Sequence, residues 1–183
     1  MFSGADLRTE RSSLDLFELL RKRHSVRNYQ TRPVENKKIL AILDAARLGP
    51  SAANLQPCHF VVVRNKKLRK SMKAAYHEEW FLQAPVIIVG CVDPGKSWCR
   101  RDGEEYWKVD TAIAMQNLIL ASTELGLGTC WIANFDEDPV KKLLNVPDSI
   151  RIVAMTPVGY ADEKQRSAVD RKPLKDMVHW DKW

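Results

Sequence analysis

The sequence lacks the features that mark membrane, secreted and metal-binding proteins. Its longest apolar run, residues 85–92, falls far short of the ~20 residues that cross a bilayer. Residues 1–11 contain no apolar leader segment, and the four cysteines form no Cys-x-x-Cys pair and no zinc-finger spacing with histidine. We therefore expect a cytoplasmic protein with reduced thiols, without a membrane partner and without a metal site.

Two nucleotide-binding fingerprints are also missing. No Gly-x-Gly-x-x-Gly follows an expected strand, and no Walker lysine pattern occurs. A permanent NAD site of the Rossmann type is therefore not supported. Repeats, linkers and low-complexity tracts are equally absent.

The composition is that of one globular domain over residues 1–183. Hydrophobic residues make up 45% of the chain and charged residues 28%, which argues against disorder. We expect residues 1–12 to form an N-terminal arm and residues 161–183 a C-terminal arm that docks on a partner, because exposed Trp180 and Trp183 would be unfavourable. The net charge of +6 favours anionic partners and leaves a basic nucleic-acid-binding domain as a distant alternative.

Helical and strand patterns alternate along the chain. We expect a first helix around Leu16–Leu20, capped by Ser12 or Ser13. Further helices are expected around residues 39–46, 66–76, 109–125 and from 138, and strands at residues 59–63, 86–92, 129–133 and 150–158. This alternation predicts an α+β or α/β domain with about four core strands.

The segment Arg23-His24-Ser25-Val26-Arg27 is the first candidate site. Arg23, Ser25 and Arg27 share one side of an extended chain, and the two arginines also share one face of a helix. Two guanidinium groups around a hydroxyl match a phosphate monoester. A solvated basic helix end is the alternative.

A polar loop, Pro50-Ser51-Ala52-Ala53-Asn54-Leu55-Gln56-Pro57, is the second candidate. It offers several side-chain donors and acceptors between a helix and a buried strand, and its alanines would let a flat ligand approach the backbone. A simple capped connection is the alternative. The weaker third and fourth candidates are the stretch Gly126–Ala133, whose glycines also suit a helix end, and the basic pair in Arg171-Lys172-Pro173-Leu174.

In this order, together with Pro157-Val158-Gly159-Tyr160, these motifs resemble those of the FMN-dependent nitroreductase family in its short single-domain form. The resemblance runs from about Leu14 to Val178. It implies an α+β, nitroreductase-like fold with a central, mostly antiparallel sheet flanked by helices. It also implies an intertwined homodimer, with exchanged C-terminal arms and FMN at the interface.

By this resemblance, Arg23, Ser25 and Arg27 hold the FMN phosphate and ribityl chain with Arg171 and Lys172. Ser51 and Asn54 resemble residues that line the flavin from a loop, which in this family often comes from the other subunit. The stretch from Cys130 faces the flavin near N5. The cofactor-binding residues implied are Arg23, His24, Ser25, Arg27, Pro50, Ser51, Ala52, Asn54, Gln56, Cys130, Trp131, Ile132, Ala133, Arg171 and Lys172.

The implied activity is transfer of electrons from NAD(P)H through bound FMN to small acceptors such as nitroaromatics or quinones, in a ping-pong cycle. The flavin carries the chemistry, so no side chain is assigned as catalytic. A flavin-binding storage or sensing protein and a reductive dehalogenase of the same superfamily are alternatives. The loop of residues 98–107 is expected to cover the site as a lid, with candidate residues Trp98, Arg100, Arg101, Tyr106 and Trp107.

Overall fold

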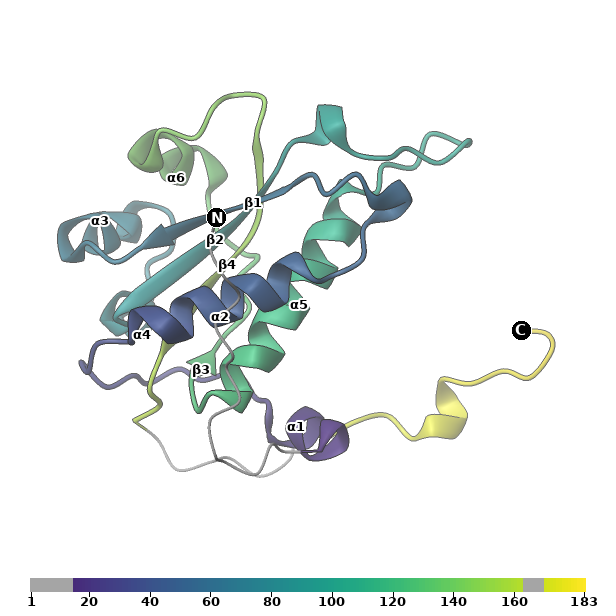
Figure 1. The fold of residues 1–183 in the computed structure, drawn as a ribbon, viewed down its shortest axis with the longest axis horizontal. Coiled ribbons are helices and arrows are strands. Elements are labelled where there is room, and N and C mark those ends of the chain that lie inside the picture. Colours follow the sequence, from purple (N-terminus) through teal and green to yellow (C-terminus); the bar gives the residue numbers. More distant parts are fainter. Residues whose placement is uncertain (1–14, 163–169) are drawn as a thin grey trace.

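A four-stranded antiparallel sheet lies between layers of helices (Figure 1). The computed structural model describes residues 15–162 and 170–183. The strands are β1 (Cys58–Val63), β2 (Val86–Val92), β3 (Gly128–Thr129) and β4 (Arg151–Gly159), in the order β1-β2-β4-β3. The α-helices are α1 (Leu16–Lys22), α2 (Asn36–Arg47), α3 (Lys66–Ser71), α4 (Glu79–Gln83), α5 (Trp107–Glu124) and α6 (Glu137–Leu144). Short 3₁₀ turns are η1 (Ala52–Asn54), η2 (Met72–Ala74), η3 (Pro94–Lys96) and η4 (Leu174–Asp176).

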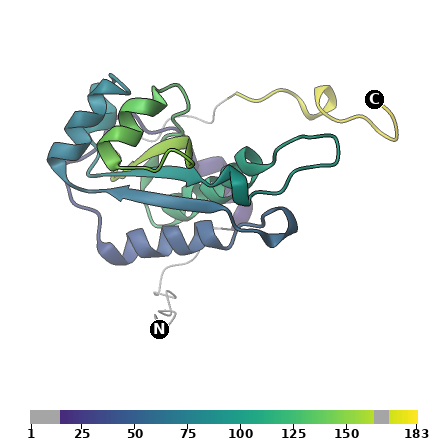
Figure 2. The ribbon, with the colours of Figure 1, turned by 90° about the horizontal axis from the view of Figure 1, so that it is seen from above.

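Strand β2 is buried along its whole length, which explains why its sequence is continuously apolar rather than alternating. Ile88 packs into one core cluster with α2 and α5, whereas Ile87 and Val89 pack into a second cluster with η2, α4 and α6. Figure 2 shows these layers, with α2 on one side of the sheet and α3 and α6 on the other.

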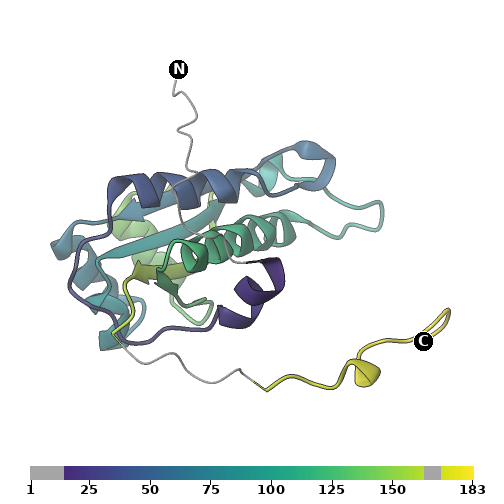
Figure 3. The same ribbon diagram turned by 60° about the horizontal axis from the view of Figure 1, so that its bottom comes forward.

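Helix α5 is the longest helix of the described chain, and α2 runs beside it (Figure 3). It buries residues around most of its circumference, as its sequence predicts. Its buried hydroxyl groups are satisfied within the helix: Thr111 donates to the Trp107 carbonyl at 2.8 Å and Ser122 to the Leu118 carbonyl at 2.8 Å. Helix α1 lies against α5, and the segment Arg23–Arg27, the first candidate site, follows directly after it.

The predicted fold class is confirmed, with local differences. Asp15 caps α1, accepting from the backbone of Phe17 at 2.7 Å and Glu18 at 3.0 Å, and the expected caps Ser12 and Ser13 lie outside the described residues, as does the arm of residues 1–12. The predicted helix at 66–76 breaks into α3 and η2, and α4 was not anticipated. The predicted strand 129–133 contracts to β3 plus an isolated bridge between Ile132 and Met155, because Cys130 and Trp131 leave the ladder.

A polar network around Glu35 ties α2 to the end of β4. The Tyr160 hydroxyl donates to Glu35 Oε2 at 2.6 Å, and Arg32 donates to Oε1 at 3.0 Å. The Arg32 guanidinium also lies 4.0 Å from the centre of the Tyr160 ring. The Tyr160 hydrogen bond, supported by the backbone and by Lys38, lowers the pKa of Glu35 to about 2.

Because the pKa of Glu35 is lower in the folded protein than its ordinary value of 4.5, its ionised form stabilises the fold above that value. This contribution is lost as pH falls toward 2. We expect Glu35→Gln to lower the free energy of unfolding at pH 7 and to flatten its loss between pH 5 and pH 3. Denaturant unfolding across this range measures both effects, with Asp148→Asn as the control. Equal pH profiles for Glu35→Gln and the wild type would contradict the assignment.

Candidate flavin site

The segment Arg23–Arg27 is extended and pairs with β3. Arg23 ends α1 in an extended conformation, Ser25 bridges to Thr129, and Val26 N–H donates to the Thr129 carbonyl at 2.9 Å. The Val26 side chain is buried on one side, so Arg23, Ser25 and Arg27 alternate to the other. The extended geometry holds, rather than the helical one.

A glycine in β3 permits this pairing. A Cβ atom on Gly128 would lie 2.6 Å from Val26 Cγ2, so a larger residue would push the two segments apart. Gly126 has a different role, because its φ of +73° suits the end of α5. In the third motif, Gly126 therefore ends helix α5, and Gly128 leaves room for the first motif to pack against β3.

Residues of the first and third motifs line one hollow of about 200 Å³. Its wall residues are Arg23, Ser25, Gln116, Ile119, Thr129, Cys130 and Trp131. No acidic side chain of the described residues lines it. This hollow, the cofactor hollow, thus offers a guanidinium, hydroxyls and an amide without a competing carboxylate.

The Cys130 thiol lies within electrostatic reach of the basic groups of the first motif. Burial raises the pKa of Cys130, while Arg27, a hydrogen bond with Ser25 and then Arg23 act in the opposite direction. Both arginines and the serine of the first motif therefore act on one atom of the third motif. Because the net shift is upward, the thiol stays protonated at neutral pH and carries no negative charge into the hollow.

Aromatic side chains that the sequence did not single out lie beside Arg27. Its guanidinium is 6.0 Å from the centre of the Trp80 ring, and Tyr76 meets that ring edge to face at 6.0 Å. Burial raises the pKa of Tyr76, and Cys130 and Arg27 both act on its phenol. Tyr76 and Trp80 therefore belong to the packing around Arg27, and neither of them lines the cofactor hollow.

The loop after α2 has an unusual backbone. Ala53, Asn54 and Gln56 have φ values of 50°, 55° and 51°, in the left-handed region. Two side chains hold it: Ser51 Oγ accepts from Gln56 N–H at 2.9 Å, and the buried Asp110 accepts from Ala52 N–H at 3.0 Å through Oδ1. Asn54 is exposed at the tip, in position to contact a molecule outside this chain.

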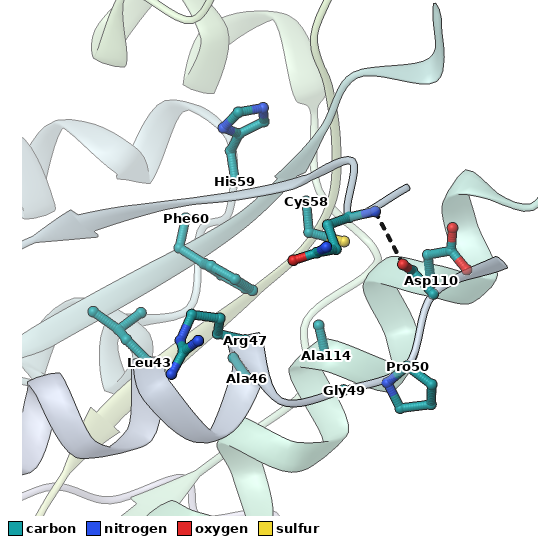
Figure 4. A pocket seen from close by; sticks show the side chains of 12 residues that line it. Leu43, Ala46, Arg47, Gly49, Pro50, Cys58, His59, Phe60, Asp110 and Ala114 are labelled. Atoms are coloured by element: carbon teal, nitrogen blue, oxygen red, sulfur yellow. Dashed lines mark hydrogen bonds between the residues drawn. The ribbon is translucent and has the colours of Figure 1, made fainter. Parts of the chain in front are cut away.

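The base of this loop borders a second hollow of about 410 Å³ between α2, β1 and α5 (Figure 4). Leu43 and Phe60 form one end and Asp110 lies toward the other, while the His59 ring points away from them. Pro50, Ser51 and Gln56 line this loop hollow. It shares no lining residue with the cofactor hollow, so one chain does not bring the first two motifs into a common pocket.

Other predicted residues are distributed unevenly. His24 lines a separate hollow with Val26, on the opposite side from Ser25. The buried Ile132 packs in the core, and Ala133 is exposed after it. Arg171 and Lys172 are exposed on the segment 170–183, which extends away from the body in all three ribbon views and lines neither hollow.

The loop of residues 98–107 is stabilised by contacts between its own side chains. Arg100 Nε and Nη2 form a bidentate pair with Asp102, at 2.8 Å to each carboxylate oxygen, and Trp98 meets Tyr106 edge to face at 5.1 Å. Trp107 starts α5, is buried, and donates from its indole to Glu105 at 3.0 Å. Within the described chain, Trp107 therefore anchors the loop, while Arg101 is exposed without a bonded partner.

No group of three or more metal-ligating side chains occurs in residues 15–162 and 170–183. In the same residues, no helix is long and apolar enough to cross a membrane.

Comparison with known proteins identifies the family. The family model described as "Nitroreductase family" matches residues 20–81 and 72–160. A Methanothermobacter thermautotrophicus protein, provisionally named an NADH dehydrogenase/NAD(P)H nitroreductase, is 35% identical over 177 residues, covering 94% of this chain and 90% of the relative. The chain belongs to the nitroreductase family, which confirms the resemblance of its motifs.

Solved structures agree. A nitroreductase family protein from Clostridium difficile 630 superposes with a TM-score of 0.87 at 31% identity, covering 93% of this chain and all of that one. A Clostridium difficile R20291 protein described as an FMN-dependent nitroreductase gives a TM-score of 0.80 at 29% identity, covering 92% and 100%. The predicted nitroreductase-like fold is confirmed.

The loop depends on Asp110 for its shape. Asp110→Ala leaves the Ala52 N–H without its acceptor, and we expect a loss of about 1–3 kcal/mol in unfolding free energy and faster hydrogen exchange in residues 51–56. Asp110→Asn keeps an oxygen in place and should retain the loop. Denaturant unfolding and peptide-resolved hydrogen exchange measure the two effects. Unchanged exchange in the alanine variant would show that the loop holds itself.

Proposed function

We propose that the chain binds FMN with its phosphate at Arg23, Ser25 and Arg27, and uses it to pass electrons from NAD(P)H to small acceptors such as nitroaromatics or quinones. As a member of its family the chain is an NAD(P)H-dependent oxidoreductase. The observation that carries the FMN proposal is the convergence of Arg23, Ser25 and Cys130 on one hollow, with Arg27 acting on the same thiol. FMN, when bound, supplies the ring that exchanges hydride and electrons.

The residues present fit such a cofactor. Arginine side chains match a dianionic phosphate in charge and geometry, and the protonated thiol adds no repulsion. The Ser25 and Thr129 hydroxyls and the Gln116 amide offer neutral hydrogen bonds for a polyol chain. The cofactor hollow is too small for a whole flavin nucleotide, so the ring system would extend past Trp131 toward a second chain.

The homodimer belongs to this proposal. Asn54 projects from a loop that does not border the cofactor hollow, and Arg171 and Lys172 stand on an exposed segment. A second copy would bring its loop and its C-terminal basic pair to the flavin of the first. The reductant and the acceptor would then use the same open face in turn, as a ping-pong cycle requires.

The purified protein tests the function directly. We expect a yellow protein that releases FMN on denaturation and oxidises NADH or NADPH when a nitroaromatic or quinone is added. A protein that neither contains nor takes up FMN contradicts the proposal. Bound FMN without turnover would indicate storage or sensing, and turnover with a halogenated aromatic alone would indicate a dehalogenase.

Replacing Arg27 by alanine isolates the phosphate contact. Loss of one charge-assisted interaction weakens FMN binding by roughly ten- to a hundredfold, measured by quenching of FMN fluorescence. Arg64→Ala, which removes the same charge from a residue bonded to Asn36, is the matched control. Equal affinities for the two variants would place the phosphate elsewhere.

The two arginines of the 98–107 loop should behave differently. Arg101→Ala raises the KM for NAD(P)H and leaves the loop intact, because Arg101 is exposed and free to meet a nucleotide phosphate. Arg100→Ala breaks the bidentate pair with Asp102, so it raises KM and also increases proteolysis within the loop. Steady-state kinetics with limited proteolysis separate the two roles. Unchanged kinetics in both variants would rule out this loop as part of the nucleotide site.

A further inference from the structure

Arg27 carries a charge that no carboxylate of the described chain neutralises. Its side chain is exposed, and it forms no hydrogen bond and no ion pair with the residues that the structure describes. Arg151 differs, because it donates to both oxygens of Glu137 while its guanidinium lies 5.4 Å from the centre of the Trp107 ring. Such pairing uses the charge and the donors that a phosphate would need. Arg27 has kept both.

The ring of Trp80 restrains Arg27 in another way. The Arg27 guanidinium lies over this ring, 6.0 Å from its centre. A ring face attracts a guanidinium through the quadrupole of its π-system and takes up none of the N–H donors. A free arginine side chain loses much rotamer freedom when it binds a ligand, so a restraint that is already in place lowers the cost of binding.

Trp80 is itself held in place by its neighbours. It is half-buried at the start of α4, and its indole N–H donates to Glu78 at 3.1 Å. Phe81, which is fully buried, meets the Trp80 ring edge to face at 6.4 Å. Trp80 also packs against the core cluster that contains Val26, the residue before Arg27. The ring is therefore a fixed part of the core surface beside Arg27.

We propose that Trp80 is a positioning residue for the cofactor, whose ring holds the Arg27 guanidinium toward the FMN phosphate without neutralising it. This inference rests on the proposed function, in which Arg27 binds that phosphate. Trp80 does not line the cofactor hollow, so it acts through Arg27 rather than by contact with the phosphate. Helix α4, which the sequence did not predict, thereby contributes to cofactor binding.

Comparing FMN with riboflavin tests this role, because riboflavin has the same ring and ribityl chain but no phosphate. We expect Trp80→Leu, which keeps an apolar side chain, to weaken FMN binding by about three- to tenfold and to leave riboflavin binding unchanged. Trp80→Phe keeps a ring face and should retain most of the FMN affinity. Fluorescence titration of the apoprotein measures both ligands. Equal losses for FMN and riboflavin would show a general structural role and overturn the proposal.

Tyr160→Leu is the matched control for lost stability. It removes another ring that lies against a guanidinium, that of Arg32 at 4.0 Å, at a place that borders neither hollow. We expect the ratio of FMN to riboflavin affinity to stay at the wild-type value in this variant. A ratio that falls as far as in Trp80→Leu would mean that the ratio reports stability, which overturns the assignment to Trp80.

A double-mutant cycle tests whether Trp80 acts through Arg27. In the Arg27→Ala background, Trp80→Leu should have little further effect on FMN binding, because the group that the ring holds is gone. Losses that simply add in the double variant would show that the two residues act independently, and would overturn the proposal.

The single variants separate this inference from the proposed function. If Arg27→Ala leaves FMN affinity unchanged, the phosphate contact is rejected, and the role of Trp80 with it. If Arg27→Ala weakens FMN binding and Trp80→Leu does not, the phosphate contact stands and only the role of Trp80 is rejected. Selective loss of FMN affinity in both single variants, without addition in the double variant, supports the proposal.

Discussion

The pairing of Ser25 and Val26 with Thr129 is the constraint on which the candidate site depends. These residues are about a hundred positions apart, and their approach requires the absence of a side chain at Gly128. Once Val26 is buried against that glycine, alternation of side chains turns Arg23, Ser25 and Arg27 to the opposite side. Arg23, Ser25 and Cys130 therefore line one hollow because Val26 occupies the buried side of the same segment.

Helix α5 contributes residues to the walls of both hollows. Gln116 and Ile119 border the cofactor hollow, while Asp110 and Ala114 border the loop hollow. Both surfaces therefore belong to one rigid element that the sheet and α2 hold in place. A change at one hollow that moved this helix would be felt at the other, whereas a change confined to a loop would not.

Much of the fold was predictable from the sequence because burial patterns are local. Strand β2 is continuously apolar, α2 shows apolar residues at helical spacing, and α5 is apolar on more than one side, so each could be predicted from its own residues. The short β3 could not, because Cys130 and Trp131 have the composition of a strand but leave the ladder. Helix α4 is short, and its aromatic residues gave no periodic signal.

The site shows the same division between local and distant information. Arg23, Ser25 and Cys130 could be selected by motif, but Asp110 bonds to a backbone N–H that lies 58 positions away and has no sequence signature. The position of Tyr76 beside Trp80 and Arg27 likewise has no sequence signature. Spacing along the sequence also could not predict that the 50–57 loop lies apart from the cofactor hollow within one chain.

Beside α3 lies a broad open hollow of about 740 Å³, whose rim carries Lys66, Arg69, Lys70 and Lys73 and a single carboxylate, Glu79. Arg69 is bonded to the Leu82 and Ala84 carbonyls, which fix its charge on this face, whereas Glu79 offsets the charge of Lys73 and leaves Lys66 and Lys70 to add to that of Arg69. A field of this sign steers dinucleotides, which are anionic, during diffusional encounter. Its reach is about 10 Å at 0.1 M salt, so the rate at which such molecules meet the protein will fall with ionic strength even where their final binding does not.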